Sequence, residues 1–133
     1  MGAIVMVFAI TTSITTLQRG FLSLDSARNL TLAGQILQCE VEKMRMVPWA
    51  TVNAYPASSP TLAMDTGFTS NPAVGARFTL SRDVTSLATG TTAGMKQVIY
   101  TVSWKSYDGR PLSRSYTTYY GQNGLYDYYF NSI

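Results

Sequence analysis

The sequence of 133 residues predicts an α+β fold, in which a long N-terminal helix packs through its C-terminal half against an antiparallel sheet of three or four strands. Three patterns support this prediction. The first 18 residues carry no charged side chain, and they start a helical pattern that continues to Pro48. A segment rich in proline, serine, threonine, asparagine and glycine follows over residues 48–75. Alternating, strand-like segments separated by turn signals occupy residues 76–130.

The helix is expected over about residues 2–47, which corresponds to about 70 Å at about 1.5 Å per residue. Its first part, residues 1–24, is hydrophobic and is expected to lie in a membrane or in the core of a filament. Hydroxyl residues between Thr11 and Thr16 dilute this part, but their side chains can bond back to helix carbonyls. The side chains expected to pack against lipid or neighbouring helices are Ile4, Val5, Val7, Phe8, Ile10, Ile14, Leu17, Phe21 and Leu24.

From Leu17 onward the helix pattern becomes amphipathic. Apolar residues recur at three- and four-residue steps as far as Met44, and most charged residues lie off this stripe. The helix is expected to end before Pro48, because the residue preceding a proline avoids the helical region. From residue 25 onward, the amphipathic part of the helix belongs to a predicted globular head, residues 25–133. The expected helix–sheet core consists of Leu30, Leu37, Val41, Met44, Phe78, Val98, Tyr100, Val102 and Trp104.

The rest of the head is expected to contain a long irregular connection followed by strands in meander order. Asp108-Gly109 is a strong signal for a two-residue hairpin turn, and Asn123-Gly124 indicates a further turn. The expected segments are an irregular connection over 48–75, a strand near 77–81, a loop over 86–94, strands over 97–104 and 112–120, and a short final strand over 126–130.

The residue types of common catalytic sites are missing. With no histidine, a Ser-His-Asp or Cys-His arrangement and a histidine-ligated metal are excluded. Glu40 and Glu42 are two positions apart on the helix, so they do not form a close carboxylate pair. The glycine-containing stretch 90–96 does not have the spacing of a phosphate-binding loop. We therefore expect no enzymatic activity, no cofactor and no metal.

The charge pattern argues against a nucleic-acid partner. The net charge is +3, charged residues make up 13% of the chain against about 25% in typical domains, and the basic residues are scattered. Ordinary solubility accounts for this charge more simply than attraction to anionic surfaces.

Three other features leave alternatives open. The nine tyrosines, six of them between Tyr107 and Tyr128, either pack across strands or form a contact surface for sugars or proteins. The single cysteine, Cys39, is either a small packing residue or the site of an intermolecular disulfide. Gly20 and Gly34 each weaken the helix by about 1 kcal/mol relative to alanine, and each either allows close approach of a neighbouring helix or is tolerated.

These features together resemble the type IV pilin-like family, which comprises minor pilins of type IV pili and pseudopilins of type II secretion. The stretch Met1–Ile10 is similar to the apolar segment that follows the family's short cleavage motif. The segment from Ala27 through Gly34-Gln35-Ile36-Leu37 to Glu42-Lys43-Met44-Arg45 is similar to the corresponding part of PilV-type minor pilins and I-type pseudopilins. The resemblance covers about the first 47 residues and is only architectural over the strands.

The resemblance implies a non-enzymatic subunit of the bacterial inner membrane, with a single membrane pass and a periplasmic head. Such a subunit contacts membrane lipid before assembly, then joins other pilin or pseudopilin subunits through its N-terminal helix in an extracellular or periplasmic filament. An inner-membrane assembly platform is a further implied partner. The family's basic leader, its cleavage-site glycine and the glutamate beyond it would lie before Met1, so we expect a misplaced start or a trimmed chain. The alternative is a single-span envelope protein whose β head binds a ligand without polymerising.

Overall fold

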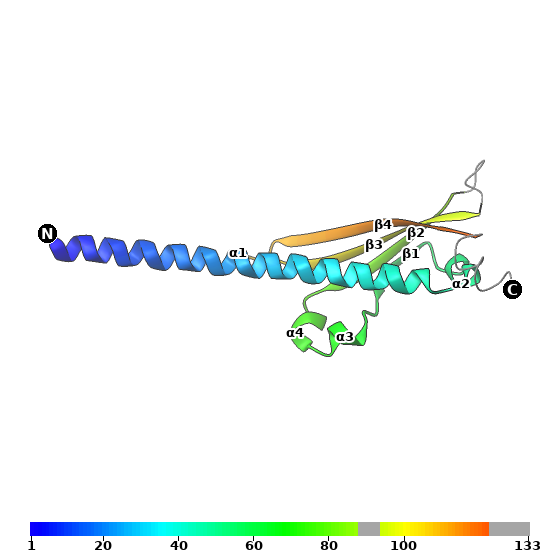
Figure 1. The fold of residues 1–133 in the computed structure, drawn as a ribbon, viewed down its shortest axis with the longest axis horizontal. Coiled ribbons are helices and arrows are strands. Elements are labelled where there is room, and N and C mark those ends of the chain that lie inside the picture. The colour runs from blue at the N-terminus through cyan, green and yellow to red at the C-terminus, as the bar shows by residue number, and fades with distance from the viewer. Residues whose placement is uncertain (88–93, 123–133) are drawn as a thin grey trace. The chain divides into compact units, whose positions relative to one another are not determined.

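The computed structural model describes residues 1–87 and 94–122, and it divides the chain into two compact units, Met1–Leu32 and Ala33–Ile133. The second unit corresponds to the predicted head, and "head" refers to it from here on. The elements, labelled in Figure 1, are α1 (Gly2–Arg45), α2 (Trp49–Asn53), β1 (Ser58–Leu62), α3 (Thr66–Thr69), α4 (Pro72–Gly75), β2 (Thr79–Leu87), β3 (Met95–Lys105) and β4 (Pro111–Gly121). The predicted α+β class is confirmed.

Helix α1 is continuous over 44 residues, close to the expected range of 2–47. The boundary between the units falls inside this helix, further along the chain than the predicted boundary between residues 24 and 25. The hydroxyls of its first part do bond back to the helix, as expected from their type. Their oxygens lie 2.8 to 3.0 Å from the carbonyl oxygens four residues earlier, in Thr11, Thr12, Ser13, Thr15 and Thr16.

The end of α1 follows from the proline after it. The last turn tightens into bonds between residues three apart, from the Met46 N–H to the Lys43 carbonyl and from the Val47 N–H to the Met44 carbonyl. Pro48 then adopts an extended conformation, with ψ of 160°, and caps the short helix α2. The predicted helix stop before Pro48 is confirmed.

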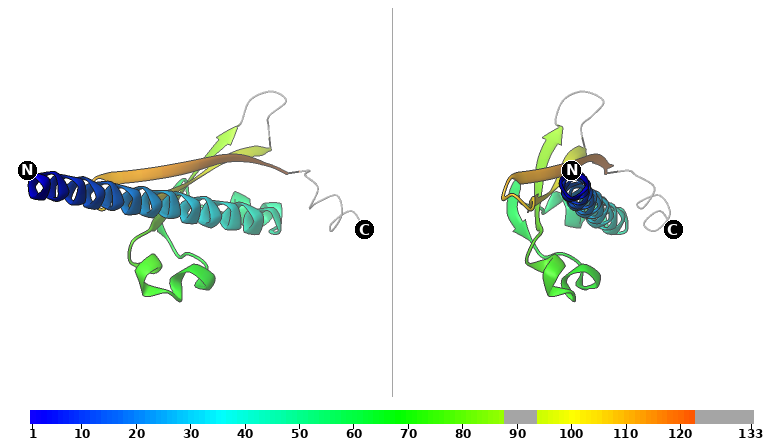
Figure 2. Two further views of the ribbon diagram at one scale, coloured as in Figure 1. Left: turned by 60° about the vertical axis from the view of Figure 1, so that its left-hand side comes forward. Right: turned by 90° about the vertical axis from the view of Figure 1, so that its left-hand side faces the viewer.

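The four strands form one antiparallel sheet in the order β1-β2-β3-β4, and the head portion of α1 lies along one face of it (Figures 1 and 2). The β2–β3 and β3–β4 pairs keep an unbroken register, for example Val84 with Val98 and Val98 with Thr118. Alternate side chains of β3 are buried, as expected for a sheet that is covered on one face. The meander order is the one that the sequence predicts.

The prediction of an irregular connection over residues 48–75 is wrong. This segment contains α2, α3, α4 and β1, and β1 adds an edge strand to the sheet next to β2. Local composition concealed β1 because it contains Pro60, a residue that strands accept mainly at sheet edges. The side chains of Asp65 and Asn71 accept backbone N–H bonds at the starts of α3 and α4, which accounts for these polar residues.

Two further details of the strands differ from expectation. Strand β2 continues to Leu87, so Ser86 and Leu87 pair with β3 instead of starting a loop. The β3–β4 turn has three residues between the paired residues Ser106 and Arg110, and Gly109 takes a positive φ of 82° there. The predicted turn at Asn123-Gly124, the final strand over 126–130 and most of the loop over 86–94 lie outside the described residues.

The core of the head lies between α1 and the sheet. The apolar side chains buried there are Ala33, Ile36, Leu37, Val41, Met44, Val52, Phe78, Leu80, Val84, Val98, Tyr100, Val102, Trp104 and Tyr120. The Phe78 and Trp104 rings meet with centroids 5.7 Å apart. Of the expected core residues, only Leu30 is not buried: its side chain is 45% exposed and it lies in the first unit. Leu30 continues the apolar stripe, but the buried apolar side chains begin only at Ala33, so the periodicity of the sequence placed this end of the core too early in the chain.

Candidate functional site

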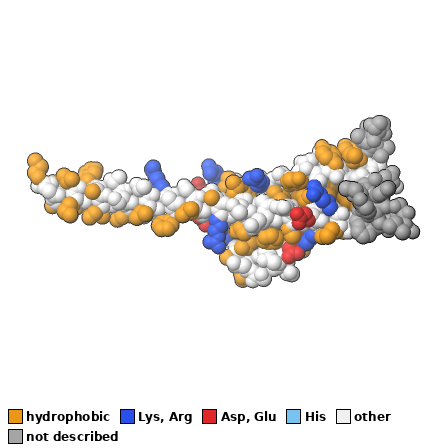
Figure 3. All heavy atoms as spheres, in the orientation of Figure 1, with side chains coloured by type: hydrophobic (Ala, Val, Ile, Leu, Met, Phe, Trp, Pro, Cys, Tyr) orange, Lys and Arg blue, Asp and Glu red, His pale blue; other side chains and the backbone are white. Residues whose placement is uncertain are grey.

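The first candidate site is the hydrophobic surface of the first unit. We define the apolar helix surface by the nine residues that the sequence singles out, and every one of them is exposed, from 51% for Ile14 to 74% for Phe8. Hydrophobic side chains cover this part of α1 in Figure 3. The residues are Ile4, Val5, Val7, Phe8, Ile10, Ile14, Leu17, Phe21 and Leu24.

This surface is apolar on every side of the helix near its start. Ile4, Val5, Met6, Val7 and Phe8 are consecutive, so they point around the whole circumference rather than along one stripe. The helix also has the length and composition of a membrane span, with a mean hydropathy of 1.3 over its most apolar window. Burial of such side chains is worth about 25 cal/mol per Å². The helix therefore gains free energy from a partner or a medium that removes these side chains from water.

The second candidate site is a groove in the head between α1 and β4, with a volume of about 320 Å³. Leu37 and Val41 of α1 supply its apolar surface, and both also belong to the core. The groove residues are Gly34, Leu37, Gln38, Val41, Glu42 and Arg45 of α1, and Arg114, Ser115 and Tyr116 of β4.

The groove carries two guanidinium groups against one carboxylate. Within the described part of the chain, neither Arg45 nor Arg114 takes part in an ion pair. Glu42 accepts a hydrogen bond from the Gln38 side-chain amide, with 3.4 Å between Nε2 and Oε1. The groove is therefore electropositive, and anionic groups are favoured in it. A Cβ built on Gly34 would meet no atom within 4 Å, so the packing of the chain does not require glycine there.

Of the described tyrosines, two pack in the core and three are exposed. Tyr100 and Tyr120 are buried, and the Tyr120 ring stacks on Trp49 with centroids 6.1 Å apart. The Tyr120 hydroxyl also donates to the Val47 carbonyl, which ties the end of α1 to β4. Tyr107, Tyr116 and Tyr119 are exposed, whereas the later tyrosines lie outside the described residues.

Polar groups next to α2 make several contacts with the sheet, although the Arg82 Nε is buried without a hydrogen-bond partner among the described residues. Lys96 donates to the Asn53 carbonyl with 3.1 Å between Nζ and O. The Arg82 guanidinium carbon lies 3.6 Å from the centroid of the Tyr55 ring, a cation–π contact. Burial raises the pKa of the neighbouring Tyr100 hydroxyl, although Arg82 acts in the opposite direction. The contacts of Lys96 and Arg82 hold α2 and the residues just after it on the sheet.

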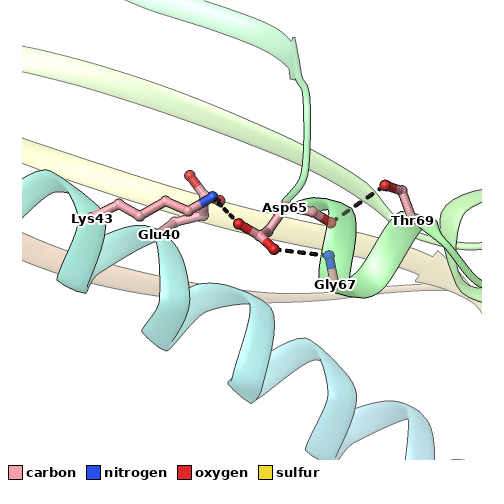
Figure 4. A network of polar contacts seen from close by, with 5 residues as sticks. All are labelled: Glu40, Lys43, Asp65, Gly67 and Thr69. Carbon is pink, nitrogen blue, oxygen red and sulfur yellow. Dashed lines mark hydrogen bonds and ion pairs between the residues drawn. The ribbon is translucent and has the colours of Figure 1, made fainter.

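The opposite flank of α1 in the head carries a polar cluster. In Figures 1 and 2, α3 and α4 lie on the side of α1 away from β4. Figure 4 shows Lys43 of α1 between two carboxylates, with its Nζ 3.3 Å from Glu40 Oε1 and 2.8 Å from Asp65 Oδ2. The other oxygen of Asp65 accepts the Gly67 N–H at 2.8 Å, so a single carboxylate both caps α3 and attaches it to α1.

The Lys43–Asp65 pair makes part of the head's stability depend on acid. The hydrogen bond from Lys43, with that from the Gly67 N–H, lowers the pKa of Asp65. Stabilisation is therefore complete above the ordinary aspartate pKa of about 4, and it is lost as the pH falls through the lowered value. We expect Asp65→Asn, which keeps a capping oxygen, to lose less thermal stability on acidification than the wild type. Melting curves of both proteins at neutral and acidic pH measure this, and equal acid losses would contradict it.

The thiol of Cys39 is not activated. Cys39 is half-buried on α1, and burial raises its pKa, with the Lys43 charge acting in the opposite direction. A raised thiol pKa is the reverse of what nucleophilic catalysis requires. Over residues 1–87 and 94–122, no three histidine, cysteine or carboxylate side chains cluster as metal ligands would.

The sequence indicated the apolar helix surface but not the groove. Arg114 did carry a usable signal, because it occupies the same strand phase as Leu112 and Thr118, and that phase points toward the helix. A charge in an inward phase indicates that this part of the strand is not buried under the helix, and Arg114 is exposed. The contribution of α1 carried no such signal, because Arg45 reads as an ordinary exposed charge in the last turn of a helix.

No family model, no curated protein and no solved structure matches this chain.

Proposed function

We propose that this chain is a non-enzymatic structural subunit of a type IV pilus-like filament, a minor pilin or a pseudopilin. In this proposal the N-terminal helix anchors the chain in the bacterial inner membrane, and the head lies in the periplasm. Assembly then transfers the helix from lipid into a bundle with the helices of other subunits.

The observation that carries the proposal is the exposed apolar helix surface, combined with a head that buries its own core. Its nine residues are all more than half exposed, whereas the buried apolar side chains of the head begin only at Ala33. A helix needs this much apolar surface outside a folded head only where its surroundings are also apolar. Lipid and a bundle of similar helices are the two surroundings that the proposal provides.

Transfer between these surroundings requires little net hydrophobic free energy. Lipid chains are as apolar as leucine side chains, so helix association in a membrane depends on packing and hydrogen bonds instead. The threonine and serine hydroxyls of the first unit already bond within their own helix, which lowers the cost of placing them in either environment. The same surface therefore suits an anchored subunit and an assembled one.

Disulfide crosslinking tests the proposal in cells that produce the chain naturally. Leu17→Cys, made in a Cys39→Ser background, places a thiol on the apolar helix surface. Mild oxidation is expected to give disulfide-linked dimers, with one thiol from each of two neighbouring copies, because the helices lie side by side in the filament. Tyr107→Cys is the matched control, since Tyr107 is similarly exposed but lies in the β3–β4 turn.

Two results would contradict the proposal. A chain that stays monomeric at Leu17→Cys in cells with assembled filaments would favour an anchored protein whose head binds a ligand alone. Equal crosslinking at Leu17→Cys and Tyr107→Cys would show random encounter in the membrane instead of ordered helix packing.

A further inference from the structure

The two edges of the sheet are protected very differently. Edge strand β1 has five residues, contains Pro60, and shifts its register between Ser59 and Leu62. Edge strand β4 has 11 residues, a continuous register against β3, and a proline only at its first position. Short length, proline, bulges and charged side chains are the usual devices that prevent an edge from pairing with another strand. Strand β4 is long and has an unbroken register, with proline only at its first position, and its single charged residue is Arg114.

The backbone groups that β4 presents outward can be assigned from its register. The Ser106 N–H bonds to the Arg110 carbonyl at one end of the ladder, and the Gln122 N–H bonds to the Gly94 carbonyl at the other. Bonded and non-bonded pairs alternate along an antiparallel ladder, so every second residue from 110 to 122 bonds to β3. The residues between them, Ser113, Ser115, Thr117 and Tyr119, direct their N–H and C=O groups to the outer edge. No described strand pairs with that edge.

The α1–β4 groove lies along the helix side of this strand, so it would receive the side chains of any strand added to β4. Arg114 and Tyr116 point to the helix side, as the burial of Val102 and Tyr100 opposite them requires. In an added strand, alternate side chains would point the same way, next to Arg114 and Tyr116 and over Gly34 and Gln38 of α1. The open space above Gly34 leaves room for them.

We infer that β4 and the α1–β4 groove form a docking site for an extended, acidic polypeptide segment of a partner protein, which adds to the sheet as a fifth strand. The outward N–H and C=O groups of β4, with which no described strand pairs, select a polypeptide main chain. The guanidinium groups of Arg114 and Arg45 select carboxylates on the side of that segment that faces the groove. The inference does not depend on whether the chain polymerises.

Amide hydrogen exchange on the full chain in detergent micelles tests this inference. The probe is a short synthetic peptide that alternates threonine and glutamate, so that one face of its extended form carries all the carboxylates. We expect the peptide to slow exchange at Ser113, Ser115, Thr117 and Tyr119, by at least about tenfold at saturation. The alternating amides at residues 112, 114, 116, 118 and 120 are expected to be protected already without the peptide.

Matched peptides and variants separate the two parts of the recognition. A threonine–lysine peptide tests charge, and an N-methylated threonine–glutamate peptide tests backbone pairing; neither is expected to protect the edge. Arg114→Gln is expected to weaken binding of the threonine–glutamate peptide by about tenfold, because charged hydrogen bonds are lost. Lys105→Gln is the control, since it removes an exposed positive charge outside the groove.

Several outcomes would overturn the inference. Outer-edge amides that are protected without any peptide would show that the edge is paired within the chain. Protection that rises with protein concentration alone would identify a second copy as the occupant. Equal binding of the N-methylated peptide would show that the groove binds anions without strand pairing. Failure of every peptide to bind would show that the edge does not accept a strand, and Arg114 would then be a charge that prevents pairing.

Discussion

Replacement of Leu37 by aspartate is expected to unfold the head. The Leu37 side chain is 3% exposed, between α1 and the sheet. The change removes a buried leucine, which costs about 2–5 kcal/mol, and leaves a carboxylate in an apolar site. We expect a loss of at least about 4 kcal/mol, against a total of about 5–15 kcal/mol for a typical domain. The thermal midpoint would fall by more than about 15 °C, or no cooperative transition would remain.

The neighbouring residue provides the control for this change. Gln38 is exposed, so Gln38→Asp introduces the same side chain on the same helix turn without burying it. Its effect is expected to stay below about 1 kcal/mol. Near-ultraviolet circular dichroism is the appropriate measurement, because α1 can stay helical in detergent after the head has lost its packing. Equal melting of Leu37→Asp and wild type would contradict the packing of α1 on the sheet.

The elements that could be predicted were those set by patterns of neighbouring residues in the sequence. The period of the helix, the stop before Pro48 and the alternation in β3 and β4 gave elements close to those observed. Strand β1 was missed because pairing with β2 stabilises it, whereas its own composition of serine and proline favours a loop. The true end of the core at Ala33 was also missed, because an apolar stripe does not record which of its residues has a partner.

The two candidate surfaces also differ in whether the sequence alone predicts them. The apolar helix surface could be predicted, since consecutive apolar residues near Phe8 leave no polar side for water. The groove depends on the phase of α1 relative to β4, which brings Gln38 and Arg45 next to Arg114 and Tyr116. The rotation of α1 that faces these residues toward β4 is set by core packing around Leu37, and no local sequence pattern indicates it.

Removal of residues 1–24 is expected to leave a folded and soluble protein. None of the buried apolar side chains lies in these residues, and the core of the head begins at Ala33. The truncation removes the apolar helix surface and keeps the part of α1 that covers the sheet. We expect the fragment 25–133 to be monomeric without detergent and to melt within about 5 °C of the full chain, since no buried side chain is lost. An insoluble or unfolded fragment would show that the two parts of α1 are not separable.

In the proposed subunit, one continuous helix serves two environments, an apolar one along residues 1–24 and the core of the head from Ala33 onward. Flotation with phosphatidylcholine vesicles measures this division of α1, with the full chain and the fragment 25–133 in parallel gradients. We expect the full chain to float with the vesicles and the folded fragment to stay at the bottom. Flotation of the fragment, or a full chain that remains soluble beside the vesicles, would contradict this division.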